Sequence, residues 1–260
     1  MPKQAGRWIG VGAAVLALAA VAFAGQAGAK PPAAAAERAI YTYVATWAVP
    51  RADWVAAEKY YQSAVPLMKA LTDSGTLEGW GQARAFVHDE SGTTHINWLT
   101  ATSFAGLAKA LEEMHSKLPL PAAFMNAKHR DEILRSTMNG GKAGAGGAGM
   151  LWLANYELQS GTPDDFADLF ETQIKPLFDA QVAAGTVLAY SLEFQAVHTG
   201  SPKLATIAYL LPDAAAIDKF QEALAAYETK NPSTGASLEA TMNYTAHRDA
   251  LFEVLAFGEK

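Results

Sequence analysis

The residues with the clearest chemical potential are two copies of one triplet, His129-Arg130-Asp131 and His247-Arg248-Asp249. An imidazole can act as a general base or bind haem iron, and a guanidinium can orient an anion. A functional interpretation therefore makes His129 and His247 bases or haem ligands. A structural interpretation makes each triplet the start of a closing strand, with Arg130 paired to Asp131 or to Asp249 of the other copy.

Strand geometry favours the structural interpretation of the triplets. Adjacent residues of a strand point to opposite faces, so the arginine and the aspartate of one triplet pair poorly with each other. A pair between the two copies, or an aspartate that caps a turn, has better geometry. The sequence therefore predicts that the triplets are a structural repeat motif.

A second histidine pair, His88 and His198, ends two runs with strand-like alternation. The residues that share a face with each histidine form an aromatic set: Trp80, Gln82, Arg84 and Phe86 in the first run, and Tyr190, Leu192, Phe194 and Ala196 in the second. If these faces line the space between two sheets, they predict a pocket for a small apolar ligand. The alternative is that both histidines simply end a strand at an exposed hairpin.

Metal binding is not predicted, although His95 follows His88 by seven residues across a hairpin turn. Two imidazoles could form a corner of a metal site, but no carboxylate stands at a metal-motif spacing from them. The sequence thus predicts no metal site and no cofactor.

Polar residues appear in the second half of the chain where the first half has apolar ones. Glu193 and Gln195 stand where Ala83 and Ala85 stand 110 residues earlier. Glu157 likewise occupies the position that Trp47 has in the first half. Such divergence is expected if one half keeps a pocket, and equally if that face is exposed.

Composition excludes several classes of function. Half of the 260 residues are apolar, which is enough for a sizeable core, and there are no cysteines, so disulfides and thiolate metal sites are excluded. Motifs for nucleotide binding, serine hydrolysis and zinc proteolysis are all missing from the sequence. A net charge of −6 argues against nucleic acid as a partner.

Residues 1–29 have the features of a secretory signal peptide. Lys3 and Arg7 precede a short apolar run from Ile9 to Phe23, and Ala27-Gly28-Ala29 is a small-residue cleavage site. The run is short and rich in alanine for a bilayer span, so we predict cleavage, a periplasmic or secreted protein and no stable membrane insertion. Residues 30–38 are predicted to be a flexible leader.

The rest of the chain is a repeat with a period near 110 residues. Pro66 and Pro176, and Gly75 and Gly185, occupy matching positions in the two copies. Each copy, 39–138 and 150–260, has alternating and helical periodicities in the order β-α-β-β-α-β, typical of a ferredoxin-like unit. The glycine-rich stretch 139–149 between them is predicted to be a flexible linker.

Two ferredoxin-like units in one chain resemble the dimeric α+β barrel superfamily, which includes antibiotic-biosynthesis monooxygenases and chlorite-dismutase-type haem enzymes. The resemblance covers residues 39–257 in element order and duplication. It implies an α+β fold in which the two sheets pack face to face as a fused barrel, and it brings haem as an alternative cofactor.

Two hypotheses of function follow. The first is an exported binding or accessory protein that holds a small apolar ligand between the sheets. The second is a monooxygenase-like or haem-dependent enzyme of this superfamily. Because the duplication supplies an internal partner, the chain is predicted to be a monomer, with a homodimer as the alternative.

Overall fold

The computed structural model describes residues 40–87 and 92–260, so the predicted signal peptide, the leader and His88 lie outside the described residues. The strands are β1 (Ile40–Ala48), β2 (Gly79–Ala85), β3 (His95–Ala101), β4 (Lys128–Gly141), β5 (Gly146–Leu158), β6 (Ala189–Gln195), β7 (Leu204–Leu211) and β8 (Met242–Glu259). The helices are α1 (Trp54–Asp73), α2 (Phe104–Lys117), α3 (Ala122–Met125), α4 (Pro163–Gln173), α5 (Lys175–Ala184), α6 (Ala215–Lys230) and α7 (Pro232–Thr241), with a 3-10 turn η1 (Arg51–Asp53).

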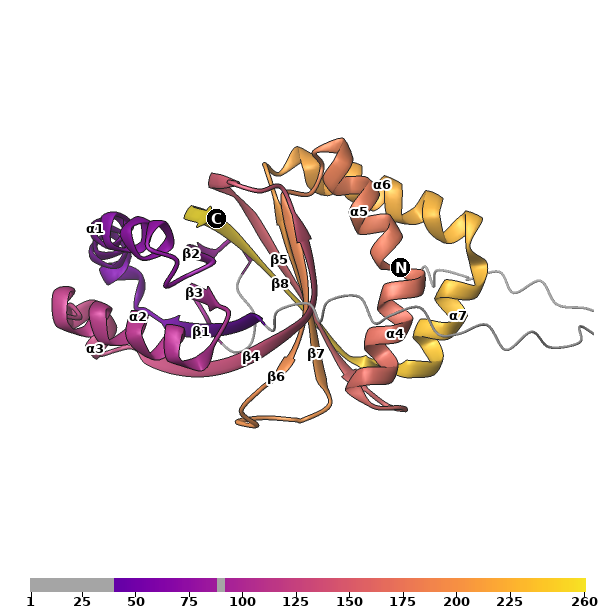
Figure 1. Ribbon diagram of the computed structural model, residues 1–260, viewed down its shortest axis with the longest axis horizontal. Helices are drawn as coiled ribbons and strands as arrows, with labels where there is room; N and C mark the ends of the chain where they lie inside the picture. Colours follow the sequence, from indigo (N-terminus) through magenta and orange to yellow (C-terminus); the bar gives the residue numbers. More distant parts are fainter. Residues whose placement is uncertain (1–39, 88–91) are drawn as a thin grey trace, which may run out of the picture. The chain divides into compact units, whose positions relative to one another are not determined.

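The strands form one closed antiparallel barrel in the order β1-β3-β2-β8-β5-β7-β6-β4 (Figure 1). Two of its seams join the halves of the chain, β2 to β8 with Ala83 opposite Val254, and β4 to β6 with Ser136 opposite Glu193. The α+β class predicted from the sequence is confirmed. The expected barrel is confirmed, whereas the direct packing of its two sheets on each other is not seen: the sheets are joined edge to edge, so that each described strand is paired on both sides, and a cavity lies between their inner faces.

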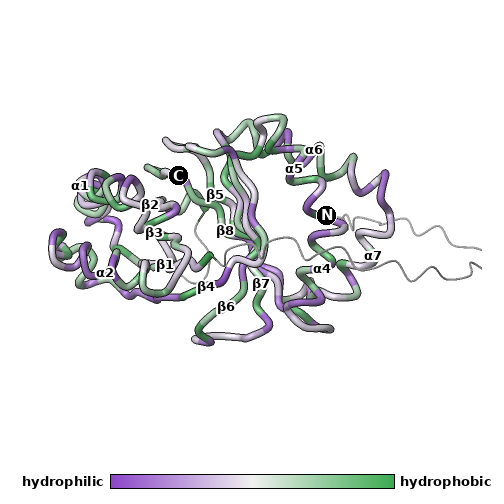
Figure 2. The backbone as a smooth tube through the Cα atoms, viewed as in Figure 1, coloured by the Kyte–Doolittle hydropathy of each residue, from purple (hydrophilic) through white to green (hydrophobic). Residues whose placement is uncertain are grey.

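Helices cover the outer surface of the barrel. On the first half, Met68 and Leu71 of α1 and Leu107 of α2 pack against Trp80 and Leu99 of the sheet. On the second half, α4, α5 and α6 pack through three phenylalanines, Phe166, Phe178 and Phe220, against β6 and β7. Figure 2 shows that strands are rich in hydrophobic residues while hydrophilic residues recur along the helices, as expected for helices with one buried side.

The helix ends follow the signals in the sequence. The Ser103 hydroxyl accepts a hydrogen bond from the Gly106 amide (3.1 Å) at the start of α2, and Thr162 with Asp165 forms a capping box at α4. Gly185 ends α5 with a φ of +75°, which favours glycine.

The two repeated prolines have different outcomes. Pro66 lies inside α1, which continues through it, whereas the matching helix of the second half divides at Ile174 into α4 and α5, with Pro176 in the first turn of α5. Proline lacks an amide proton and fits the first turn of a helix without the loss of a hydrogen bond. The second helix therefore restarts at its proline.

The predicted flexible linker 139–149 is wrong for most of its length. Gly140 and Gly141 belong to β4 and Gly146–Gly149 to β5, so only a short turn remains between the strands. These glycines allow close packing: a Cβ at Gly140 would lie 2.6 Å from the Tyr190 ring, and one at Gly149 would lie 2.3 Å from the Leu211 carbonyl oxygen. The absence of side chains here serves strand contact, and the described residues 40–87 and 92–260 belong to one compact unit.

Candidate functional site

A cavity of about 800 Å³ occupies the inside of the barrel. It is lined by alternate residues of the strands, the pattern expected for one face of a pleated sheet. The lining includes Thr42, Val44, Ile96, Trp98, Leu134, Ser136, Leu151, Leu153, Glu193, Thr206, Ala208, Ala250 and Phe252. A volume of this size is in the range of small-molecule sites.

One side of the cavity is apolar. Leu151 of β5, Phe252 and Val254 of β8 and Leu210 of β7 belong to one buried cluster that also contains Ala83 of β2. Ala83 and Val254, which pair at the seam between β2 and β8, extend this cluster beyond the lining; the apolar part of the lining itself comes from β3, β5, β7 and β8. An apolar ligand that leaves water for such a wall gains free energy in proportion to the area it buries.

The seam between β4 and β6 is polar instead. Glu193 of β6 is 6% exposed and faces the cavity, and its Oε1 accepts a hydrogen bond from the Thr42 hydroxyl of β1 at 2.7 Å. The Ser191 hydroxyl also bonds to the Glu193 side chain, and Ser136 lies opposite Glu193 across the seam. Burial raises the pKa of the Glu193 carboxyl above its usual value, and the hydroxyls of Thr42 and Ser191 offset part of this rise.

Further polar contacts lie nearer one end of the barrel. Glu132 accepts hydrogen bonds from Arg130 and from the Gln195 amide (2.8 Å), while the Thr206 hydroxyl donates to Asn155 Oδ1 at 2.8 Å. These groups satisfy each other, so they offer fewer free hydrogen-bonding positions to a ligand than the Glu193 seam does.

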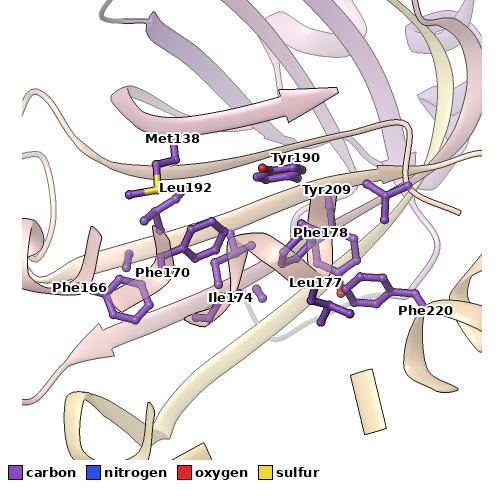
Figure 3. Packing of buried hydrophobic residues seen from close by; sticks show 14 of the residues in the cluster. Met138, Phe166, Phe170, Ile174, Leu177, Phe178, Tyr190, Leu192, Tyr209 and Phe220 are labelled. Carbon is purple, nitrogen blue, oxygen red and sulfur yellow. The ribbon is translucent and has the colours of Figure 1, made fainter. Parts of the chain in front are cut away.

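Three of the ligand-binding residues predicted from the sequence, Trp80, Phe194 and Tyr190, pack against the helices. Trp80 packs under α1 with Met68, and Phe194 has an edge contact with Phe166 of α4. Figure 3 shows Tyr190 among the side chains of this outer core, where its ring lies 4.9 Å from that of Phe178. Some atoms of Tyr190 also reach the cavity lining.

The remaining members of that predicted set are not brought together either. Arg84 forms ion pairs with Glu58 and Glu253, and Phe86 is exposed. His198 is exposed at the hairpin between β6 and β7, as the alternative interpretation expected. The chosen strand face was wrong because helices bury the outer face as fully as the cavity buries the inner one, so both faces are apolar in the sequence.

The two triplets have matching environments at the starts of β4 and β8. The His129 ring stacks on Trp47 with centroids 4.6 Å apart, and His247 stacks on Tyr156 at 4.2 Å. Asp131 accepts a hydrogen bond from the Tyr43 hydroxyl at 2.9 Å. The corresponding Asp249 accepts one from the Trp152 indole at 2.8 Å and lies 3.1 Å from His247 Nε2.

The arginines of the triplets differ from the aspartates in their partners. Arg130 pairs with Glu132 of the same strand, and Arg248 donates to the carbonyl oxygens of Thr245 and His247. The pairing of Arg130 with Asp131 or Asp249 expected from the sequence is therefore wrong, because alternation along β4 puts Arg130 and Glu132 on the same face. Both arginines contribute to the cavity lining.

His95 has a buried position that its place beside a hairpin did not suggest. It is fully buried between the sheet and α1, with edge contacts to Trp54 and Tyr61, and its Nδ1 lies 3.0 Å from the Thr94 hydroxyl. Burial lowers the pKa of the His95 imidazole to about 4. Its Nε2 has no hydrogen-bond partner among residues 40–87 and 92–260.

The described residues do not fit haem inside the barrel. Among the described residues that line the cavity, the only histidine is His129, which is at the end of β4 and stacked on Trp47. Haem iron needs an axial side chain such as histidine aimed into the pocket. Within residues 40–87 and 92–260 there is also no group of three or more metal-binding side chains. The described wall of the cavity therefore lacks an inward-facing histidine for haem iron.

Sequence reasoning missed Glu193 and Thr42 as cavity residues. A signal for Glu193 was present, because it replaces the Ala83 of the first half with a carboxyl in an otherwise apolar strand. Thr42 gave no such signal, since a threonine in an aromatic and β-branched strand is ordinary.

No described helix is long and apolar enough to cross a lipid bilayer. No family model matches the sequence, and no curated protein matches it significantly. Solved structures do match. A protein provisionally assigned as a monooxygenase, from Lactobacillus acidophilus NCFM, has a TM-score of 0.62 at 12% identity and covers 86% of this chain and 97% of its own.

A second protein with the same provisional assignment, from Fusobacterium nucleatum, also has a TM-score of 0.62, at 8% identity, and covers 86% of this chain and 96% of its own. At these identities the likeness concerns the fold. Together with the closed eight-stranded barrel and its outer helices, it shows that the chain shares the fold of these two proteins, a closed α+β barrel of the kind that the sequence resemblance implied.

Proposed function

We propose that this protein binds a small, largely apolar molecule inside its barrel. The observation that carries the proposal is the cavity of about 800 Å³, whose wall along β3, β5 and β8 is apolar. A protein interior is normally filled to the density of an organic crystal, so an opening of this size among aliphatic and aromatic side chains is a favourable place for an apolar ligand.

The binding test uses N-phenyl-1-naphthylamine, a neutral probe that becomes fluorescent in apolar surroundings. We expect saturable binding, with quenching or enhancement of tryptophan emission because Trp98 lines the cavity. The variant Ala208→Trp places an indole inside the cavity and should lower the affinity at least ten-fold. The matched control is Ala225→Trp on the exposed surface of α6, which should bind as the native protein does.

Two outcomes would contradict the proposal. One is the absence of saturable binding of any apolar probe to the folded native protein. The other is equal loss of affinity in the two tryptophan variants, which would place the probe outside the barrel.

A monooxygenase-like enzyme that acts on an aromatic substrate is the second candidate. Two solved structures with the same fold are provisionally assigned as monooxygenases, and the cavity contains the buried carboxyl of Glu193, which can exchange a proton with a substrate. Oxygen consumption in the presence of a bound aromatic ligand, measured with an oxygen electrode, would support it. Binding without oxygen consumption would support the binding function and contradict the enzyme.

We also propose that the barrel arose from two ferredoxin-like repeats, 39–138 and 150–260. The strand order is β4-β1-β3-β2 in the first half and β8-β5-β7-β6 in the second, which is the same order with matching elements. If each half forms such a unit, chains 38–143 and 144–260 expressed together should associate one to one and bind the probe. On the same grounds we propose a monomer, which sedimentation equilibrium would test against a homodimer.

Export is proposed from the sequence of residues 1–29. Mass spectrometry of protein recovered from outside the cytoplasm should show an N-terminus at Lys30. An intact N-terminus on the exported protein would exclude cleavage at this site.

A further inference from the structure

The lining of the cavity has an apolar side and a polar side, and a purely apolar ligand would not require the polar one. Glu193 lines the cavity from β6, whereas the residue 110 positions earlier is Ala83 of β2, which lies opposite the lining residue Ile96 and belongs to an apolar cluster. A buried carboxyl costs free energy unless its polar atoms are bonded, and replacement by an apolar residue would remove that cost. The second half retains the carboxyl at a place where the first half shows that alanine fits the fold.

The surroundings of Glu193 support a role as a hydrogen-bond donor. Thr42 occupies Oε1 with its hydroxyl at 2.7 Å. Burial raises the pKa of the carboxyl, so the protonated form persists to a higher pH than that of an exposed glutamate. A protonated carboxyl has one proton to donate, and in a low-dielectric cavity a single such bond can select among ligands.

No cation directly faces the carboxyl along the described inner surface. On the neighbouring strand β4 the inward-facing charged residues are Arg130 and Glu132, which pair with each other, and β8 contributes Arg248. The lining residues from β1, β3, β5 and β7 are uncharged. The remaining titratable residues of the lining come from the ends of strands or from residues beyond them: Glu78, Lys128, His129, Lys142, Tyr190, Tyr209, Glu259 and Lys260.

We infer that Glu193, positioned by Thr42, forms a polar subsite that recognises one hydrogen-bond acceptor, such as a ketone or aldehyde oxygen, on an otherwise apolar ligand. The inference rests on the proposed binding function and narrows it to a class of ligand. The apolar wall along β3, β5 and β8 takes the hydrocarbon part, and the seam between β4 and β6 takes the oxygen. No covalent step is involved.

The test compares two probes of nearly equal shape, 2-acetylnaphthalene and 2-ethylnaphthalene, each displacing N-phenyl-1-naphthylamine from the full chain. At pH 5 the native protein should bind the acetyl compound roughly ten-fold more tightly, as expected for one hydrogen bond in a buried site. Glu193→Gln keeps a donor and should keep the preference, whereas Glu193→Leu should lose it. Circular dichroism of each variant checks that it is folded.

A pH series separates hydrogen-bond donation from a merely structural role. Ionised Glu193 cannot donate, so the preference of the native protein should fall as the pH is raised from 5 to 9. The preference of Glu193→Gln should stay constant over the same range, because an amide does not titrate. The carbonyl stretching frequency of bound 2-acetylnaphthalene should shift to lower energy in the native protein and not in Glu193→Leu.

The outcomes distinguish this inference from the proposed function. Equal binding of the two probes by the native protein at pH 5, or an unchanged preference in Glu193→Leu, would overturn the subsite and leave the cavity function standing. If neither probe nor the fluorophore binds, the cavity function fails and the subsite fails with it.

Discussion

The rings of His247 and Tyr156 lie parallel, with centroids 4.2 Å apart and an interplanar angle of 1°. In the other half of the chain His129 stacks on Trp47. In both halves the aspartate two residues after the histidine is hydrogen-bonded to an aromatic side chain of the first strand, Tyr43 or Trp152. The triplets therefore connect the first and last strands of each half through aromatic contacts.

His247→Ala should destabilise the fold without a change in probe binding. The loss of an aromatic stack together with a contact to Asp249 is expected to lower the free energy of unfolding by about 1 kcal/mol. Urea denaturation measures the first effect, and fluorescence titration with N-phenyl-1-naphthylamine measures the second. A large fall in probe affinity with unchanged stability would support the functional interpretation of the triplets.

Gly81→Ala should both destabilise the barrel and alter the cavity. A Cβ at Gly81 would lie 1.9 Å from the Trp98 ring, so the indole must move, and Trp98 lines the cavity. Overpacking of this kind costs about 1–3 kcal/mol, and the displaced ring should weaken probe binding.

The matched control for Gly81→Ala is Gly235→Ala in α7, where an added Cβ would meet nothing within 4 Å. Alanine is the better helix former, so this change should stabilise the protein by up to about 1 kcal/mol. Similar denaturation midpoints for the two variants would contradict the close approach of Gly81 and Trp98.

His95 should make the protein less stable as the pH falls. Its folded pKa of about 4, lowered by burial, lies below the ordinary histidine value of 6.5. Between these values the unfolded chain binds a proton that the folded protein does not, so stability is lost as the pH falls from 6.5 toward 4, by about 3 kcal/mol. In His95→Leu the difference between unfolding free energies at pH 7 and pH 4 should shrink by that amount; an unchanged difference would refute the assignment.

Glu259 should make the protein less stable as the pH rises, the opposite of the effect of His95. Burial raises its folded pKa to about 7 from 4.5. The folded protein therefore holds a proton that the unfolded chain has released, and this contribution is complete below pH 4.5 and is lost as the pH rises through 7. Relative to the native protein, the free energy of unfolding of Glu259→Gln should rise by on the order of 2 kcal/mol between pH 4.5 and pH 9, with allowance for partial exposure of the carboxyl. A constant difference across this range would show that the carboxyl does not titrate in this way.

Local features of the fold were predictable from the sequence to a large extent. Strand β1 has the predicted bounds at its start and end, and the caps at Ser103 and Thr162 form. These features depend on neighbouring residues, whose spacing is visible in a linear sequence.

The candidate site was less predictable, because it depends on which face of each strand turns inward. In β6 both Leu192 on the outer face and Glu193 on the inner face are buried, so a two-residue period alone does not orient the strand. The choice between the faces depends on pairing between strands far apart in the chain, such as β4 with β6. The carboxyl of Glu193 was the one local indication of the inner face of β6, and it could be interpreted only once the strands were placed in the barrel.

The seam between β2 and β8 has a consequence for the order of events during synthesis. Ala83 meets Val254, a residue that the ribosome adds long after β2 has emerged. Until β8 is available, β2 has an open edge and the apolar lining of the barrel is accessible to water and to other chains. Nascent chains that stall before β8 should therefore be targets for chaperones that recognise exposed strands, and the pairing of β8 with β2 is the step that closes the barrel around its cavity.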